Sequence, residues 1–214
     1  MPAATARLLP PSDETAPTTH DRIVEAAARS FREIGYQKTT VADIARTLKM
    51  SPANVYRFFD SKKAINEAVV ERLTGEVEAM IVRIAETPNL DAPERLTRIV
   101  TALHNDCHRR FEAHPRVHEM VEAAMSESWA VCQAHVDRIG AVLARVVADG
   151  VREGAFTVAD PKGAAACLHA AITRYCHPVL VSRQPERVEP PLPAMIAFLL
   201  GALRPAGDGC RHPK

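Results

Sequence analysis

Helix start signals recur along the chain and constrain its fold more than any other feature. Thr18 and Thr40 each precede an aspartate by three residues, which is the spacing of a capping box. Ser51-Pro52 and Asp160-Pro161 place a capping residue before a proline at the first helical position. Gly35 stands where the end of a helix needs a left-handed residue. These signals predict a chain built from successive helices.

Hydrophobic periodicity fills the segments between the start signals. Apolar residues spaced at i, i+3, i+4 and i+7 indicate amphipathic helices. The expected helices are 19–34, 41–48, 51–59, 62–86, 92–113, 116–125, 127–153, 161–181 and 191–204. Aromatic residues make up only 5% of the chain, which also favours helices over strands.

Composition narrows the class of protein. A net charge of +1 excludes a polybasic protein but allows a local basic patch. Five cysteines without regular spacing argue against a disulfide scaffold and fit reduced thiols in the cytosol. Neither a membrane span nor a signal peptide is evident. We therefore expect a cytoplasmic protein that does not enter a membrane and needs no cofactor.

Two short helices joined by a tight turn, 41–48 and 51–59, predict a helix-turn-helix whose second helix enters the DNA major groove. The Ser51 hydroxyl and the free backbone N–H groups at the start of this helix can bind a phosphate. Asn54 and Arg57 share a face, and their side-chain types match adenine and guanine edges. Between residues 19 and 66, nine Lys and Arg stand against five Asp and Glu. This local basic excess is what attraction to DNA phosphates requires.

The runs Thr40–Ala45 (TVADIA) and Ser51–Ile65 (SPANVYRFFDSKKAI) resemble the tetracycline-repressor (TetR/AcrR) family. The strong resemblance covers about residues 19 to 66. Two positions depart from the family pattern: Ala53 replaces the usual glycine, and Lys49-Met50 replaces a common Gly-Val. We expect both departures to alter operator preference without breaking a helix.

The resemblance implies specific contacts with DNA. It implies phosphate contacts from Thr40, Tyr56 and Lys62. It also implies that Ala53, Asn54 and Arg57 face bases. The family binds palindromic DNA as homodimers, so recognition helices roughly 34 Å apart are expected.

The resemblance also implies an architecture. The expected fold is all-α, with an N-terminal three-helix helix-turn-helix DNA-binding domain joined to a C-terminal helical ligand-binding and dimerisation domain. We expect a disordered arm at 1–17, the DNA-binding domain at 18–66, the effector-binding and dimerisation domain at 67–204 and a flexible tail at 205–214. The helix 62–86 belongs to both domains and would couple them.

The C-terminal half is expected to bind a small-molecule effector that releases a repressor from its operator. Mixed aromatic, thioether and polar side chains on central helices suit an adaptable pocket. The candidate pocket residues are His108, Phe111, Met120, Met125, Trp129 and Tyr175. The helices 161–181 and 191–204 match the family's interface pair, and Leu168, Ile172 and Leu199 are expected to face the partner.

Three other classes of function compete with a DNA-binding regulator. The first is a metal- or redox-sensing regulator, since His104/His108, Cys132/His135 and His169/Cys176 can each share a helix face. These pairs lack a consensus spacing between them, so no metal site is assigned. The second is an enzyme, but the sequence has no nucleophile elbow, phosphate loop or paired carboxylates. The third, a helical adaptor, does not predict the basic bias around the helix pair.

Overall fold

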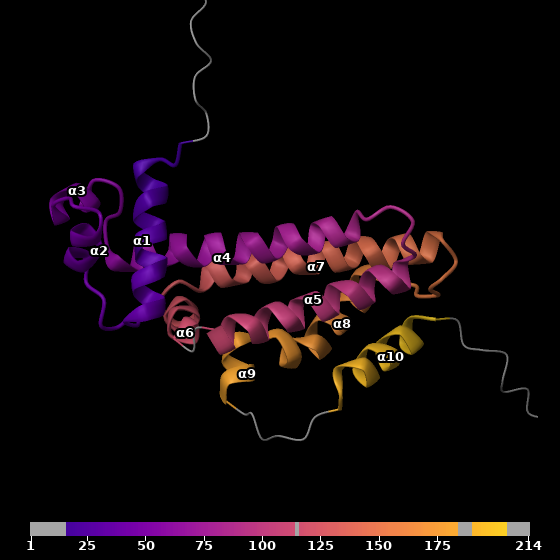
Figure 1. Ribbon diagram of the computed structural model, residues 1–214. Coiled ribbons are helices and arrows are strands. Elements are labelled where there is room, and N and C mark those ends of the chain that lie inside the picture. The colour runs from indigo at the N-terminus through magenta and orange to yellow at the C-terminus, as the bar shows by residue number, and fades with distance from the viewer. Residues whose placement is uncertain (1–15, 114–115, 184–189, 205–214) are drawn as a thin grey trace, which may run out of the picture.

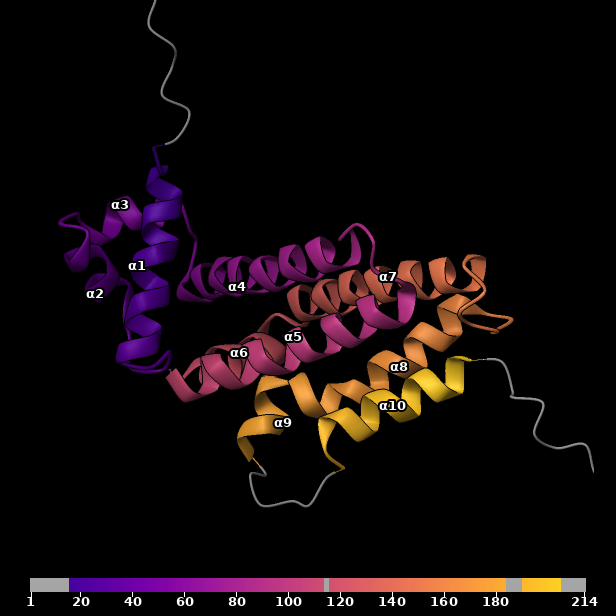
Figure 2. The same ribbon diagram turned by 45° about the vertical axis from the view of Figure 1, so that its right-hand side comes forward.

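The computed structural model describes residues 16–113, 116–183 and 190–204. The expected tail and all but the last two residues of the expected arm lie outside these ranges. The described part is helical, with three short helices at one end of a bundle of longer ones (Figures 1 and 2). The helices are α1 (Thr19–Glu33), α2 (Val41–Thr47), α3 (Pro52–Tyr56), α4 (Lys62–Ala85), α5 (Ala92–Ala113), α6 (Val117–Glu127), α7 (Trp129–Arg152), α8 (Pro161–Cys176), α9 (Pro178–Arg183) and α10 (Leu192–Leu203).

The predicted start signals are confirmed by their hydrogen bonds. Thr18 and Thr40 each form a complete capping box with the aspartate three residues on. Hydrogen bonds from these threonines lower the pKa of Asp21 and of Asp43. Ser51 and Asp160 each precede a proline in the first helical turn, and each side chain accepts a hydrogen bond from a backbone N–H of that turn. Gly35, which follows the end of α1, has φ +102°. Local chemistry therefore defines most helix starts.

Two hydrophobic clusters organise the packing. The first joins α1, α2 and α3 to the start of α4 through residues such as Ile23, Ile44 and Ile65, and Met120 of α6 also belongs to it. The second joins the end of α4 to α5, α7 and α8, with Leu143 and other residues fully buried. Helices α4 and α6 therefore contact the three-helix end and the long bundle at once.

Two predicted helices are wrong in extent. The expected helix 161–181 is two helices, because Pro178 cannot donate a backbone hydrogen bond and forces the residue before it out of the helical region. His177 accordingly has φ −88° and ψ 121°. The expected helix 51–59 ends at Tyr56, and Ser61 then caps the first turn of α4.

None of the helices in the described ranges is long and apolar enough to cross a membrane.

Candidate functional site

The turn between α2 and α3 fixes the direction of the second helix. Lys49 has φ +55° in this turn, and the Met50 N–H donates to the Ala45 carbonyl at 3.0 Å. A left-handed residue there explains why glycine is common at this position in the family that the sequence resembles. Lys49 takes the strained conformation and adds a positive charge beside α3. The observed geometry is a helix-turn-helix.

Helix α3 presents part of its predicted contact set to solvent. Val55 is fully buried, whereas Ala53, Tyr56 and Arg57 are exposed. These three residues share a helix face at i, i+3 and i+4 spacing. Ser51 is exposed as well, and its hydroxyl oxygen accepts from the Asn54 N–H at 3.2 Å. A continuous exposed face therefore runs from the start of α3 past its end.

The side chains of Asn54, Thr40 and Lys62 already make contacts within the protein, which the sequence does not indicate. Asn54 is half-buried, with its side-chain nitrogen 4.0 Å from the sulfur of Met50. The Thr40 hydroxyl is exposed but donates to Asp43 at 2.6 Å. The Lys62 ammonium donates to the Gln37 carbonyl at 3.3 Å and lies 4.3 Å from the centre of the Tyr36 ring. The Lys62 side chain is therefore half-buried and held by contacts within the DNA-binding end of the molecule.

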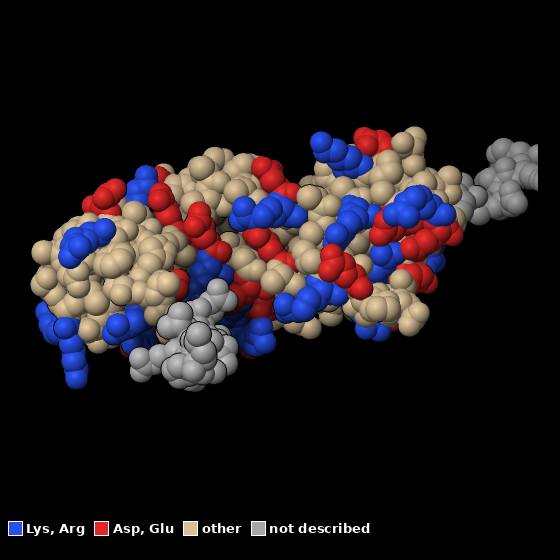
Figure 3. All heavy atoms as spheres, turned by 90° about the horizontal axis from the view of Figure 1, so that it is seen from above, with Lys and Arg blue, Asp and Glu red and all other residues tan. Residues whose placement is uncertain are grey.

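Two phenylalanines that follow α3 have different environments. Phe59 is buried and packs on His20 with ring centroids 4.6 Å apart. Phe58 is 43% exposed. Basic side chains project from this end of the molecule, while Lys and Arg mix with Asp and Glu along the bundle (Figure 3). The exposed face thus combines positive charge with aromatic surface.

A large cavity of about 1070 Å³ lies in the bundle, lined by residues of α4, α5, α6, α7 and α8 and by the first residue of α9. Its walls are mainly apolar. Of the six residues expected to form a pocket, Met125 and Trp129 line it. Trp129 is 55% exposed and stands at the edge of the cavity. This size matches the pockets that hold drug-sized ligands.

The other expected pocket residues lie elsewhere or are not described. Met120 is fully buried in the cluster around α1 to α3. Tyr175 is buried and its hydroxyl donates to the Pro190 carbonyl at 2.8 Å. The His108 ring packs on His104, with centroids 4.2 Å apart. The side chain of Phe111 lies outside the described residues. Met120 and Tyr175 are placed by contacts outside their own helices, which no local sequence pattern carries.

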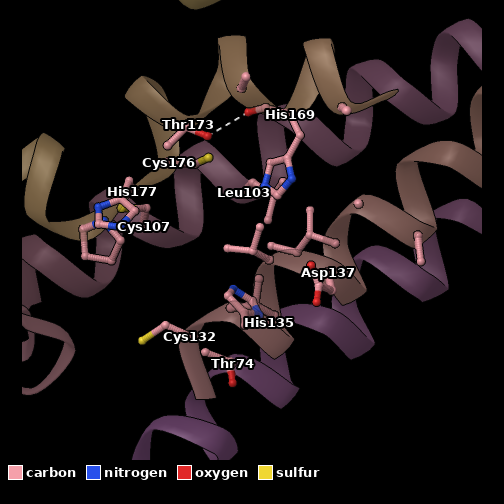
Figure 4. Close-up of a pocket in the computed structure, with 18 of the residues that line it drawn as sticks. Thr74, Leu103, Cys107, Cys132, His135, Asp137, His169, Thr173, Cys176 and His177 are labelled. Atoms are coloured by element: carbon pink, nitrogen blue, oxygen red, sulfur yellow. Dashed lines mark hydrogen bonds between the residues drawn. The ribbon is translucent and has the colours of Figure 1, made fainter. Parts of the chain in front are cut away.

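The thiols and imidazoles on the cavity wall were not predicted as pocket residues. They are Cys107, Cys132, His135, His169, Cys176 and His177 (Figure 4). The i, i+3 pair Cys132/His135 and the i, i+7 pair His169/Cys176 carried the signal, since both spacings put two side chains on one face. From the sequence alone, these pairs are interpreted only as candidate metal ligands.

The cavity thiols are protonated at neutral pH. Burial raises the pKa of Cys107 and of Cys176 to about 12, and it also raises the pKa of Cys132. Reactive and metal-binding cysteines need thiolate character. Across the described ranges, no three His, Cys, Asp or Glu side chains group in a way that could hold a metal ion. The metal- or redox-sensing alternative is therefore not favoured.

A basic helix-turn-helix at one end of an all-helical body, with a cavity in that body, defines a DNA-binding regulator of the helical class. Two family models match the chain. Residues 23–69 match "Bacterial regulatory proteins, tetR family", and residues 92–189 match "Tetracyclin repressor-like, C-terminal domain". The chain belongs to the TetR family and is a DNA-binding transcriptional regulator.

One curated relative is similar over a short segment. It is the biofilm operon negative transcriptional regulator IcaR of Staphylococcus aureus, with 43% identity over 51 residues. That match covers 24% of this chain and 27% of the length of IcaR. The likeness is therefore confined to one segment of each protein.

Solved structures share the whole fold. A TetR/AcrR-family regulator from Thermobifida fusca has a TM-score of 0.63 at 23% identity, covering 90% of this chain and 98% of its own. A complex of SmeT with triclosan has a TM-score of 0.61 at 20% identity, covering 88% of this chain and 92% of its own. SmeT is the repressor of a multidrug efflux pump in Stenotrophomonas maltophilia. These likenesses support the fold.

Proposed function

We propose that the protein is a homodimeric repressor that leaves a palindromic operator when a small, largely apolar molecule occupies the cavity. One observation carries the proposal: α4 and α6 each contribute to the core of the helix-turn-helix and to the wall of the cavity. Val69 and Met120 lie in that core. Val70 and Val121 line the cavity, one position further along the same two helices.

Polar contacts strengthen the link between α6 and the DNA-binding end. The Tyr36 hydroxyl donates to Glu127 at 3.1 Å, and the Asn66 amide donates to the Met120 carbonyl at 3.2 Å. Burial and the Glu127 carboxylate raise the pKa of Tyr36 to about 12, so this phenol remains a donor. Arg116, at the start of α6, donates to the carbonyl of Glu33, the last residue of α1. A shift of α6 therefore changes the position of the helix-turn-helix relative to the bundle.

The junction between α6 and α7 carries a further contact. The Ser128 hydroxyl donates to the carboxylate of Glu67 on α4. Trp129 follows immediately and stands on the cavity edge. A ligand that prefers one arrangement of this junction biases the DNA-binding end by its difference in affinity for the two arrangements.

In this proposal the exposed face of α3 reads the operator. Ala53 and Arg57 meet base edges, with Asn54 beside them, and Thr40, Ser51 and Tyr56 contact phosphates. Lys62 adds a phosphate contact through the donors that Gln37 leaves unused. Two similar proteins support the assignment. IcaR is described as a negative regulator, and SmeT is both a repressor and the protein of a triclosan complex.

The proposed dimer interface uses α8 and α10, which pack against each other on the side of the body away from α4 (Figures 1 and 2). The expectation that Leu168 and Ile172 face a partner is wrong, because both are buried in the protomer's own core. Leu199 is half-buried against the same core. Phe198 is 71% exposed beside it and is the better interface residue.

Thermodynamic linkage tests the effector role. The experiment needs a DNA duplex and a set of compounds. The purified chain selects the duplex from a random pool, and the compounds are apolar molecules, of which triclosan is tested first. A compound that binds wild type is predicted to weaken duplex affinity, and the duplex must weaken compound binding by the same factor. The Trp129→Ala variant should lose affinity for the compound and keep its affinity for the duplex. A compound that binds without changing duplex affinity would refute the effector role.

A further inference from the structure

Three imidazoles reach the cavity from different parts of the chain. His135 lies on α7, His169 lies on α8, and His177 stands at the break before α9. The rings of His135 and His169 extend into the cavity from opposite walls (Figure 4). The surrounding surface is mainly aliphatic, so these rings are the most prominent polar groups of the wall.

The rings keep nitrogen atoms without a protein partner. His177 Nδ1 is buried and makes no hydrogen bond. No hydrogen bond joins the His169 ring to any residue of the described ranges, and the ring lies 4.0 Å from the site of a Cβ on Gly140. His135 uses Nδ1 to bond Glu78 at 2.7 Å, which leaves its Nε2 for another group. A buried polar atom is normally paired, so the unpaired Nδ1 of His177 on the cavity wall points to a ligand.

Charged groups around the rings are already neutralised. Asp106 bonds Arg110 at 2.7 Å and also pairs with Arg109. Glu78 bonds Arg138 at 2.6 Å as well as His135. The walls of the described cavity therefore offer a ligand cation no unpaired buried carboxylate.

The remaining charged groups lie at the cavity's exposed margin. Asp137 is exposed and accepts from Gln133 at 2.8 Å. Asp160 and Lys162 are exposed at the start of α8, where Asp160 caps the helix. The thiols of the wall are protonated, as shown above. The imidazoles are therefore the groups able to accept a proton inside the cavity.

On the proposed function, in which the cavity is the effector site, we propose that the effector is an apolar organic acid whose carboxylate binds between His135 and His169 while one imidazole takes up a proton from solution. An imidazolium and a carboxylate form a charge-assisted hydrogen bond, which is stronger than a neutral one. The aliphatic walls hold the remainder of the molecule.

The pKa directions agree with this exchange. Burial, followed by the charge of His135, lowers the pKa of His169 and of His177 below the usual 6.5. Both rings are thus neutral in the free protein at neutral pH. A bound carboxylate favours the charged ring and raises its pKa. Because the complex holds more protons than its separate parts, affinity increases as pH falls.

Three probes with the same ten-carbon chain test the head group: decanoate, decan-1-ol and decyltrimethylammonium. Binding to the full chain without DNA is followed by calorimetry and by the fluorescence of Trp129, the only tryptophan. Decanoate is predicted to bind about tenfold or more tightly than the other two near pH 6.5. Between about pH 8 and pH 6.5 its affinity should rise by up to about tenfold per unit, while decanol affinity stays constant.

Two matched variants locate the site. His169→Gln should bring decanoate affinity down to that of decanol and abolish its pH dependence, while decanol binding reports an intact cavity. Lys162→Gln removes a cation at the exposed margin and should change neither. Four results with the wild-type protein would overturn the inference. They are equal affinities for the three probes, a preference for the ammonium, decanoate binding that does not depend on pH, and no decanoate binding. Decanol that binds as tightly as decanoate and releases DNA would preserve the effector role while refuting the acid.

Discussion

Arg57 shows how a single residue connects local structure with operator reading. It is the C-cap of α3, and its exposed side chain follows a turn in which Val55 is fully buried. The buried residue fixes the rotation of the helix, and this rotation directs Arg57 outward. A guanidinium in this position has the fork of donors that matches the edge of guanine.

Arg57→Ala is predicted to cost about 1–3 kcal/mol of operator binding and to relax selectivity at one base position. The matched control is Arg83→Ala, at the far end of α4. The measurement is fluorescence anisotropy on the selected duplex and on duplexes that each change one base pair. A uniform loss across all sequences would instead assign Arg57 to a phosphate.

Residue-scale prediction from sequence succeeded where the chemistry is local. The capping boxes of Thr18 and Thr40 involve residues three apart, so the pattern contains the whole interaction. Met120 and Lys62 were harder. Met120 fills a core made by helices more than fifty residues earlier, and Lys62 is positioned by Gln37 and Tyr36. No local pattern carries such contacts.

Among the helices, α6 is the element on which the proposed mechanism depends. One face of α6 packs in the core around α1 to α3 and another lines the cavity, and hydrogen bonds of Arg116 and Glu127 hold its two ends. From the sequence, coupling is predicted for the helix 62–86 alone, because only that helix is continuous between the expected domains. The part played by α6 arises from packing, which periodicity cannot reveal.

The close approach of α7 to α5 gives a test of the bundle. A Cβ on Gly150 would lie 2.1 Å from the Phe156 ring and 2.8 Å from the Ala92 Cβ. Both neighbours are buried and cannot move aside. Gly150→Ala should therefore lower the free energy of unfolding, since overpacking of about 1–3 kcal/mol exceeds the roughly 1 kcal/mol of helix propensity gained.

Gly75→Ala is the matched control, because nothing lies within 4 Å of its added Cβ in the middle of α4. This variant should gain about 0.5–1 kcal/mol from helix propensity. Urea unfolding followed by circular dichroism measures both. Opposite signs are expected, and a stabilised Gly150→Ala would contradict the packing of α7 against Phe156.

At the scale of the whole molecule, the predicted succession of helices gave the correct fold class. The motif at 40–65 gave the correct family. The location of the cavity and of the exposed apolar surface was harder to predict from the sequence. Leu168 and Phe198 are both apolar residues on C-terminal helices, yet one is 3% exposed and the other 71%. Tertiary packing makes this difference, and it moves the proposed interface onto α10.

The central claim is that two copies of this chain read one palindromic site. Selection of duplexes from a random pool by the purified full chain tests it most directly. The account predicts an enriched palindrome with half-site centres about one helical turn apart, roughly 34 Å. Phe198→Glu, which places a charge on the proposed interface, should abolish enrichment of the full palindrome. Enrichment of a single unpaired half-site by wild type, or of no sequence, would contradict the account.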